Sequence, residues 1–508
     1  MIKKIFPSVQ SFNLILILFA FLIFHSQSVT AQVKFQKQIK NGLNYLYNFN
    51  LEKAEDVFRK IKTKNPDHPA GYHYQSIINL WHFLDQKKDS DKTEFLNLSD
   101  SVVLKSKDIL DEDDKNPFVY FLLGMTYSYR AMIYARDVEY LNVLWSTKES
   151  YKYLNKALEI DSTYYDAYLG LGLYNFAVSQ TPPAWKWALE LTDITGDKKV
   201  GVEYLKLAAD KGNLATIEAK FYLSQVLSEF LMEYSSSEKY LSSLIFNYPN
   251  NILFRYGMAL LYIRETKLSN AEKYLRAIIK NSDTSFVQIK TFANYQLGNI
   301  FFIRNDFDSA KTFFKIFLEN TIDEHFRGYA ALKLAFCYEF MNLSDSAAVY
   351  FKKTSMGNED IDEDVYAADM GERFLDNSPD SLDLKLIKIQ NYIDAGLYKI
   401  AIDSSLKVIK TNINDSLKAQ LYLMLSDGYY KIKKYSLSLD YAISVINIDY
   451  AEEWMKAYAC YYAARASKEM KNIIDAELFI NYANNYNDFY FENRLRNSLH
   501  ALLYSIHK

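Results

Sequence analysis

The stretch Leu297-Gly298-Asn299-Ile300-Phe301, with Ala310 further on, decides the fold of this chain. A small residue at 298 is followed by an aromatic residue three positions later and by a second small residue twelve positions later. A spacing of three places the first two side chains on one face of a helix. We interpret the pattern as two helices that pack closely against each other, with a turn between them.

The same pattern recurs at four other places along the chain. They are Gly42, Tyr45 and Ala54; Ala259, Tyr262 and Ala271; Ala335, Tyr338 and Ala347; and Ser426, Tyr429 and Ser438. We call the first small residue of each set its anchor. The anchors at 259, 298 and 335 are separated by 39 and 37 residues. A repeat of this length predicts an array of helical hairpins, and such arrays present surfaces for binding.

The composition agrees with long helices. The 508 residues include only 15 Gly and 8 Pro, so residues that interrupt helices are rare. The chain is too long for a single core, which indicates several domains or one elongated array. The formal charge of −3 leaves no large positive charge to hold nucleic acid, so we expect no nucleic-acid partner.

One repeat near the N-terminus carries a more specific pattern. Gly42, Tyr45, Ala54, Phe58 and Pro66 fall where tetratricopeptide repeats place their small, aromatic, small, aromatic and proline residues. The chain therefore resembles the tetratricopeptide repeat (TPR) proteins. The resemblance implies an all-α, TPR-like superhelix of antiparallel helical hairpins, in which the first helix of each hairpin lines a concave groove.

The segment 124–216 is the least repeat-like part of the chain, and it carries a second resemblance. Its residues are Gly172, Tyr174 or Phe176, Asn175, Ser179, Pro182, Pro183, Gly196, Gly201 and Leu205. They are similar to the glycine–aromatic–Asn phrase, the Ser before a Pro-Pro pair and the later Gly-x-x-Gly-leucine region of one eukaryotic TPR family. That family is linked to the mitochondrial outer membrane and to clearance of protein inclusions. The resemblance covers about residues 120–240, implies an all-helical array and brings no catalytic residues.

The first 31 residues have the pattern of a secretory signal peptide. Lys3 and Lys4 precede an apolar run from Phe12 to Phe24, and the small residues around Ala31 follow. The run is shorter than the ~20 residues that span a bilayer. We predict cleavage after Ala31 and export, to the periplasm. Secretion from the cell and an uncleaved membrane anchor are the alternatives.

We divide the rest of the chain at an acidic segment. The expected parts are a TPR-like array at 32–356 with its irregular segment at 124–216, an acidic connector at 357–380, and C-terminal hairpins with a cap at 381–508. Asp360, Asp362 and Asp364 resemble the start of a calcium loop. However, Val365 and Gly371 stand where such a loop requires Gly and Glu. We therefore predict a solvated connector.

Motifs for catalysis or for a cofactor are absent from the sequence. Cys337 and Cys460 lie in different repeats, so we expect two small buried side chains rather than a disulfide. His73 and His82 are nine residues apart, on opposite sides of a helix, and cannot share a metal ion from there. A dinucleotide fingerprint that begins at Gly170 lacks its last glycine. We expect neither an enzyme, nor a cofactor, nor a metal site.

The residues expected to bind a partner lie on the first helices, at positions −6, −3, +1, +4 and +5 from each anchor. They are Tyr295, Asn299, Phe302, Phe336 and Phe340, with Arg264 and Lys431 as cations. An aromatic, neutral groove suits an apolar peptide, or else a neighbouring element of the same chain. Trp185 and Trp187 form either an exposed aromatic platform or a cover for the neighbouring repeat.

Together these features predict the function only as a class. We expect an exported, non-catalytic scaffold that binds a protein or peptide partner in its concave aromatic groove. The alternative is a structural subunit of a cell-envelope or secretion assembly, which would contact the membrane through that complex.

Overall fold

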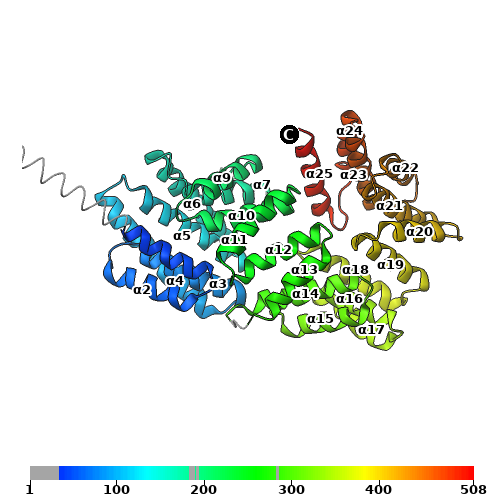
Figure 1. Cartoon of the computed structure of the whole chain (residues 1–508), viewed down its shortest axis with the longest axis horizontal. Helices are drawn as coiled ribbons and strands as arrows, with labels where there is room; N and C mark the ends of the chain where they lie inside the picture. Colours follow the sequence, from blue (N-terminus) through cyan, green and yellow to red (C-terminus); the bar gives the residue numbers. More distant parts are fainter. Residues whose placement is uncertain (1–33, 182–188, 190–193, 282–284, 508) are drawn as a thin grey trace, which may run out of the picture. The chain divides into compact units, whose positions relative to one another are not determined.

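The computed structural model describes residues 34–181, 189, 194–281 and 285–507, and within these ranges the chain is helical and contains no strand. The predicted all-α fold of TPR-like hairpins is thereby confirmed. Trp185, Trp187 and the predicted cleavage site at Ala31 lie outside the described residues. Contacts divide the chain into two compact units, which Figure 1 shows in sequence colours. Of the described residues, unit 1 contains those up to 220 together with 247–251, and unit 2 contains 221–246 and those from 252 to 507.

Unit 1 is built from consecutive helices that pack against their neighbours in sequence. They are the helical stretch 34–47, α2 (Leu51–Lys64), α3 (Ala70–Gln86), α4 (Asp89–Glu112), α5 (Pro117–Arg136), α6 (Tyr140–Ile160), α7 (Ala167–Ser179), α9 (Lys198–Lys211) and the first residues of α10 (Thr216–Glu229).

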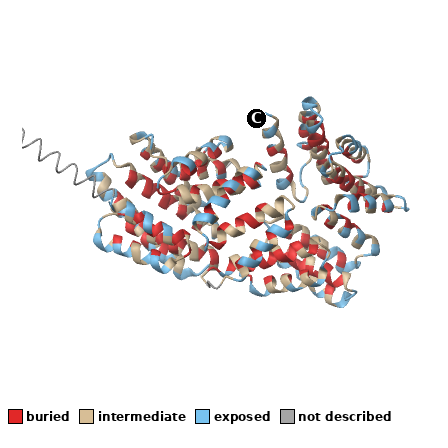
Figure 2. Ribbon diagram, in the orientation of Figure 1, coloured by how far each residue is buried: buried red, intermediate tan, exposed pale blue. Residues whose placement is uncertain are grey.

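Unit 2 repeats the same arrangement. Its helices are the rest of α10, most of α11 (Tyr234–Asn247), α12 (Ile252–Arg264), α13 (Leu268–Ile279), α14 (Val287–Ile303), α15 (Phe307–Asn320), α16 (Arg327–Phe340), α17 (Ser344–Phe351), the 3₁₀ turn η2 (Thr354–Met356), α18 (Asp362–Asp376), α19 (Ser381–Asp394), α20 (Tyr398–Ile409), α21 (Asp415–Lys431), α22 (Tyr435–Ile446), α23 (Glu453–Glu469), α24 (Ile473–Ala483) and α25 (Glu492–Ile506). In Figure 2, buried residues lie on the facing sides of these helices and exposed residues on the outward sides.

One turn joins the two helices of the repeating hairpins. The residue two positions before the second helix has a left-handed backbone, as at Thr266 (φ 61°), Asn305 (φ 59°) and Asn342 (φ 56°). In the central hairpin, the amide of Asp306 donates to the carbonyl oxygen of Phe301 at 2.9 Å. The left-handed residues are 39 and 37 residues apart, and each lies seven residues after an anchor. The spacing predicted from the anchors is therefore the spacing of the hairpins.

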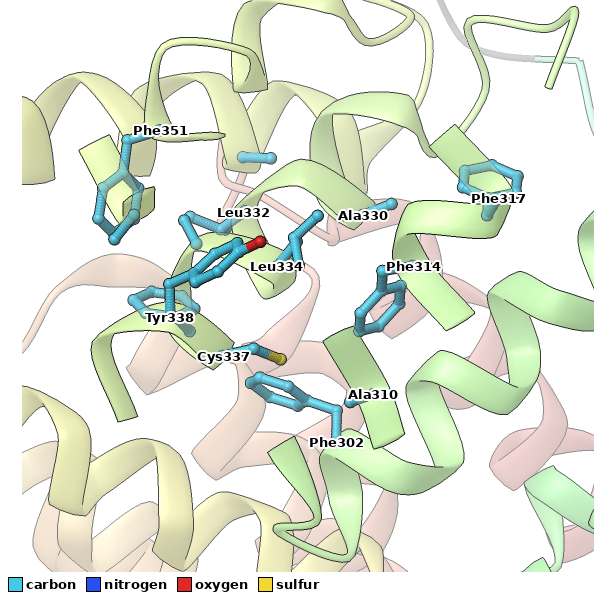
Figure 3. Close-up of a cluster of buried hydrophobic side chains, with 14 of the residues drawn as sticks. Phe302, Ala310, Phe314, Phe317, Ala330, Leu332, Leu334, Cys337, Tyr338 and Phe351 are labelled. Atoms are coloured by element: carbon cyan, nitrogen blue, oxygen red, sulfur yellow. The ribbon is translucent and has the colours of Figure 1, made fainter. Parts of the chain in front are cut away.

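The two glycine anchors, Gly298 and Gly42, are small because an aromatic ring lies against each of them. A Cβ atom on Gly298 would lie 2.7 Å from Cδ1 of Phe314, and one on Gly42 would lie 2.3 Å from Cε1 of Phe58. Figure 3 shows the hydrophobic cluster around Phe314 in unit 2, where this ring lies near Ala310 and Phe302 and the Cys337 side chain points into the same cluster. Both cysteines are buried and unbridged, so the prediction of small buried side chains holds for Cys337 and Cys460.

The hairpin of α5 and α6 departs from the repeat. Its anchor at Gly124 has no small residue twelve positions later because α5 continues to Arg136. A Cβ on Gly124 would instead lie 2.6 Å from Cγ of Leu154, deep in the second helix. The two helices have 20 and 21 residues, so they pack over more turns than the other hairpins.

The acidic segment 357–380 contains a helix, α18, and one of its carboxylates is buried. Asp364 is 2% exposed. It accepts hydrogen bonds from the backbone N–H groups of Phe326 at 2.7 Å, Tyr329 at 2.9 Å and Asn358 at 3.0 Å. The prediction of a solvated side chain is wrong for Asp364, because its carboxylate satisfies free N–H groups at the start of α16.

Candidate functional site

The aromatic side chains predicted to face a partner lie in the core of unit 2. Tyr295, Phe302 and Phe336 are 3%, 4% and 7% exposed. The Phe302 ring lies 5.5 Å from that of Phe307, and the half-buried Phe340 stacks on Phe307 at 3.9 Å. These rings hold neighbouring hairpins together, as dense core packing requires.

An element of the same chain covers part of this aromatic cluster. The Asn391 amide on α19 donates to the carbonyl oxygen of Phe302 and to Oδ1 of Asn305, both at 2.9 Å. The Lys388 ammonium lies 5.0 Å from the centre of the Phe340 ring. Of the two occupants that the sequence left open, these contacts favour the chain's own helix α19.

The predicted polar residues lie in different surroundings. Asn299 is 9% exposed, and its Oδ1 accepts a 2.8 Å hydrogen bond from Nζ of Lys333. Arg264 forms an ion pair with Glu229 at 3.2 Å. Lys431 is exposed at the end of α21. Of these three predicted residues, Asn299 is therefore the one that contacts a cluster of charged residues, through Lys333.

Lys333 on α16 and Asp394 on α19 are close enough for the charge of each to act on the pKa of the other. Burial lowers the pKa of Lys333 to about 8, and the charge of Asp394 opposes this shift. Burial raises the pKa of the Asp394 carboxyl to about 6, although the residue reaches solvent, and a hydrogen bond from Gln390 at 2.9 Å opposes that shift. Within the described part of the chain, neither Lys333 nor Asp394 forms an ion pair. Two unlike charges are thus partly desolvated without direct neutralisation.

Arg465 on α23 is linked to these two charges through its partner Asp427. Its guanidinium pairs with Asp427 on α21 and lies between the rings of Tyr430 and Tyr462, 4.1 Å from the centre of each. Arg465 is 8% exposed, and its buried Nε has no hydrogen-bond partner. The charge of Asp427 also contributes to the raised pKa of Asp394. We call Asn299, Lys333, Asp394, Asp427 and Arg465 the inner face of unit 2.

The C-terminal segment borders the inner face. Arg494 in the first turn of α25 pairs with Glu363 on α18, and its charge also acts on the pKa of Lys333 and of Asp394. The Tyr458 hydroxyl on α23 donates to the carbonyl oxygen of Phe491 at 3.2 Å. The start of α25 therefore contacts both α18 and α23.

Part of the inner face follows the position rule used on the sequence, and part does not. Ala464 lies seven residues before the left-handed Lys471, as an anchor does. Counted from Ser426 and Ala464, position +1 gives Asp427 and Arg465, so a consistent application of the rule would have found both. Asp394 lies at +5 in a hairpin whose corresponding anchor is Ile389, which is not small. Lys333 lies at −2, outside the rule, because its long side chain reaches across to Asn299.

The outward side of one terminal hairpin is unusually apolar. On the second helix of a hairpin, the outward side includes the positions three, seven and eleven residues after the left-handed turn residue. These residues are Glu52, Asp56 and Lys60 in α2; Lys399, Asp403 and Lys407 in α20; Ser436, Asp440 and Ser444 in α22; and Ile474, Leu478 and Tyr482 in α24. The three in α24 are 80%, 42% and 48% exposed. We call them the α24 stripe. In unit 1, Leu141 and Trp145 of α6 hold the first two of these positions and are 83% and 52% exposed.

The glycines of the second resemblance mark the crossing of α7 and α9 in unit 1. A Cβ on Gly201 would lie 2.7 Å from the backbone N of Phe176, and one on Gly172 would lie 2.8 Å from Cγ of Leu205. Asn175 on α7 holds the residue just before α9, because its Oδ1 accepts a hydrogen bond from the backbone N–H of Asp197 at 3.3 Å. These motif residues therefore act in packing.

The described ranges contain neither a candidate metal site nor a candidate membrane-spanning helix. They contain no group of three or more His, Cys, Asp or Glu side chains that could hold a metal ion. No helix in these ranges combines the length and apolar character needed to cross a membrane.

Repeated hairpins with one turn geometry and one small-residue spacing define a TPR-type helical repeat protein. Residues 13–323 match the family model described as Iml2/Tetratricopeptide repeat protein 39, and the chain belongs to this family. The matched range includes residues 120–240, where the sequence showed its second resemblance. No curated protein matches this chain.

Solved structures similar to this chain share little sequence with it. The human IFIT1 dimer with PPP-AAAA is 12% identical, with 89% of this chain and 94% of that chain covered and a TM-score of 0.36. Yeast Tom70 is 11% identical, with 94% and 96% covered and a TM-score of 0.28. The structure of Naa15/Naa10 bound to HypK-THB is 15% identical, with 81% of this chain covered and a TM-score of 0.26. This chain spans 63% of the length of that last one.

Proposed function

We propose that this chain is an exported, non-catalytic scaffold that binds a protein or peptide segment on the inner face of unit 2. A TPR-type fold is in general that of a protein-interaction scaffold, since stacked hairpins create extended surfaces. The observation that carries the proposal is the pair of Lys333 and Asp394. Burial lowers the pKa of Lys333, the pKa of Asp394 is raised although this residue reaches solvent, and neither forms an ion pair within the described residues. Groups with such perturbed pKa values gather at binding and catalytic sites.

A peptide offers the chemistry that these two groups lack. A backbone carbonyl or carboxylate can accept from the Lys333 ammonium, and a backbone N–H can donate to the Asp394 carboxylate. The tyrosines beside the cluster, including Tyr329 at 4.4 Å from the Lys333 ammonium, add apolar surface with polar edges. The buried rings of Phe302 and Phe336 serve to support this surface.

Crosslinking in cells tests the site directly. A photoreactive residue is placed at the exposed Gln390, beside Asp394 on α19, and, as a matched control, at Asp440 on the outward side of α22. We expect a discrete crosslinked protein partner from position 390 only, and about tenfold less of it when Lys333→Met is added. Equal labelling from both positions, or labelling that Lys333→Met leaves unchanged, would contradict the proposal.

Export is tested separately. The N-terminal sequence of the protein recovered from the periplasm is expected to begin at Gln32, after cleavage behind Ala31. Retention of Met1, or recovery from the cytoplasm alone, would contradict this part of the proposal without affecting the inner face.

The α24 stripe favours a second candidate function, a structural subunit of a cell-envelope assembly docked through its C-terminal hairpin. Exposed apolar patches of this kind mark contact sites. Under this alternative, Leu478→Asp releases the protein from the envelope fraction, whereas Ser436→Asp on the polar outward side of α22 does not. If neither variant changes fractionation, the alternative fails and the inner-face proposal stands.

A further inference from the structure

A pocket of about 290 Å³ opens between α15, α16 and α17, and it shares no lining residue with the inner face. Its wall carries three cations: Lys315 from α15, Arg327 at the start of α16 and Lys353 just after α17. Glu319 is the only acidic residue of the lining. The pocket therefore has a net positive charge in a chain whose formal charge is −3.

These cations lack carboxylate partners, and in this Arg327 differs from other arginines of unit 2. Arg276 and Arg304 share Glu272, at 2.8 Å and 2.5 Å, and Arg465 pairs with Asp427. By contrast, none of the lining cations forms an ion pair with any residue in the described ranges, and neither does Glu319. Three positive charges thus meet around one space, where the charge of Glu319 acts on Lys315 without a direct ion pair.

The Arg327 guanidinium has a donor to spare. Its Nη2 donates to the carbonyl oxygen of Thr321 at 2.9 Å, but its buried Nε has no hydrogen-bond partner. A buried donor without an acceptor costs free energy, and a bound acceptor would recover it. Guanidinium also presents the fork geometry that carboxylates and phosphates prefer.

The two lysines are held beside a pair of tyrosines. The rings of Tyr338 and Tyr350 stack at 5.5 Å between centres and 15° between planes. The Lys353 ammonium lies 5.0 Å from the centre of the Tyr350 ring, and the Lys315 ammonium lies 5.6 Å from that of Tyr338. A hydrogen bond with Tyr338 raises the pKa of Lys315, so this lysine stays charged. Leu318 and the Tyr350 ring supply apolar lining beside these charges.

We propose that this pocket binds an anionic group, a carboxylate or a phosphate, carried on a small apolar or aromatic body. The anion would accept from the Arg327 guanidinium and lie near the Lys315 and Lys353 ammonium groups, while the apolar body contacts Tyr350 and Leu318. The volume suits a ligand of the size of one aromatic ring with its anionic group. This inference does not depend on the proposed function of the inner face.

Titration of the full chain with small probes tests it. The probes are benzoate and phenyl phosphate. Benzylamine, which carries the same ring with a positive charge, is the control. The readout is the ¹⁵N signal of the Arg327 Nε–H group, assigned by its loss in Arg327→Lys. We expect saturable shifts with at least one of the two anions and none with benzylamine. The ratio of the affinities for benzoate and phenyl phosphate then shows whether the pocket prefers a carboxylate or a phosphate group.

Variants separate binding from folding. Arg327→Lys keeps the charge but removes Nε, and we expect about tenfold weaker binding, followed by calorimetry. Lys353→Gln on the exposed rim should weaken binding several-fold. Arg373→Lys, at an exposed arginine paired with Asp383, is the matched control and should change nothing. The proposal fails if neither anion binds below about 10 mM, if benzylamine binds as well, or if folded Arg327→Lys binds like the unaltered chain.

Discussion

Oδ1 of Asp364 on α18 accepts a 2.9 Å hydrogen bond from the backbone N–H of Tyr329 on α16, a residue 35 positions earlier in the chain. The same carboxylate accepts from Phe326, which stands in the left-handed conformation just before α16. A side chain from one helix therefore caps another helix, which joins two hairpins of unit 2 by a buried charge rather than by a local turn.

We predict that Asp364→Ala lowers the free energy of unfolding by about 2–4 kcal/mol, because buried N–H groups lose their acceptor. The measurement is urea unfolding of the full chain, followed by hydrogen exchange at the first amides of α16. Asp360→Ala, at an exposed carboxylate of the same acidic segment, is the control and should change stability by less than about 0.5 kcal/mol. Equal effects of the two substitutions would show that Asp364 is not a cap.

The crossing of α7 and α9 should tolerate no methyl group. In Gly201→Ala the new Cβ would meet the backbone at Phe176 N and at Gly172 O, 3.0 Å away, and neither atom can move alone. We expect a loss of about 1–3 kcal/mol. The control is Gly428→Ala, where the nearest atom is Cγ1 of Ile402 at 3.0 Å, in a flexible side chain.

In that control, the gain in helix propensity should offset the contact, so its stability should stay within about 1 kcal/mol of the unaltered chain. Hydrogen exchange of the α7 and α9 amides reports the effect of Gly201→Ala, and that of the α21 amides reports the effect of Gly428→Ala. A larger increase of exchange in α21 of Gly428→Ala than in α7 of Gly201→Ala would contradict the assignment of the crossing.

Unit 1 should lose stability as the pH rises through neutrality. The Glu218 carboxylate accepts from the hydroxyls of Tyr129 at 2.8 Å and Tyr47 at 3.3 Å, yet burial raises its pKa to about 7. A carboxyl with a raised pKa binds its proton more tightly in the folded state. Its contribution is therefore most favourable below about pH 4.5, declines between pH 4.5 and 7, and is fully lost above pH 7.

Glu218→Gln isolates this effect. We expect the variant to match the unaltered chain in hydrogen-exchange protection of α5 at pH 4.5 and to exceed it at pH 8, by about 2–3 kcal/mol. The comparison at fixed pH removes the opposite contribution of His73, whose pKa burial lowers to about 3. A difference that does not grow with pH would overturn the assignment.

Arg465 should not be replaceable by lysine. Its guanidinium is flat, and Tyr430 and Tyr462 contact it from two sides while Asp427 takes one end. We predict that Arg465→Lys lowers the free energy of unfolding by about 1–2 kcal/mol. Arg494→Lys is the control, because the Arg494 side chain is 62% exposed and its pairing with Glu363 should contribute less than about 1 kcal/mol. Urea unfolding of both variants checks the difference.

The fold could be predicted from the sequence to the level of its repeat. The anchors gave the hairpin spacing, since the turn and the close approach at Gly298 depend on residues that are near in sequence. The sequence is misleading at one place inside α6. Ser146 and Glu149 have the spacing of a capping box, which would start a helix near Tyr151, but Ser146 is buried in the middle of a continuous helix. Packing against α5 continues the helix through that local signal.

The candidate site could be predicted only in part. The position rule finds the right helices and, applied in full, two members of the inner face, Asp427 and Arg465. It also selected Phe302 and Phe336, because a periodic pattern cannot tell an aromatic ring that faces a partner from one that another helix covers. Asn391, which fastens α19 over Phe302, is 89 residues away in sequence.

The amino-acid sequence by itself determined the class of this protein: helical hairpins, their period and the close contacts within each, because these depend on side chains a few turns apart. Only the tertiary structure decided which carboxylate caps a distant helix, which aromatic rings are covered, and which distant charges act on each other, as those of Lys333 and Asp394 do. The physical reason is the distance along the chain. Local spacing fixes the geometry of one hairpin, whereas burial and charge at a site depend on how several hairpins pack together.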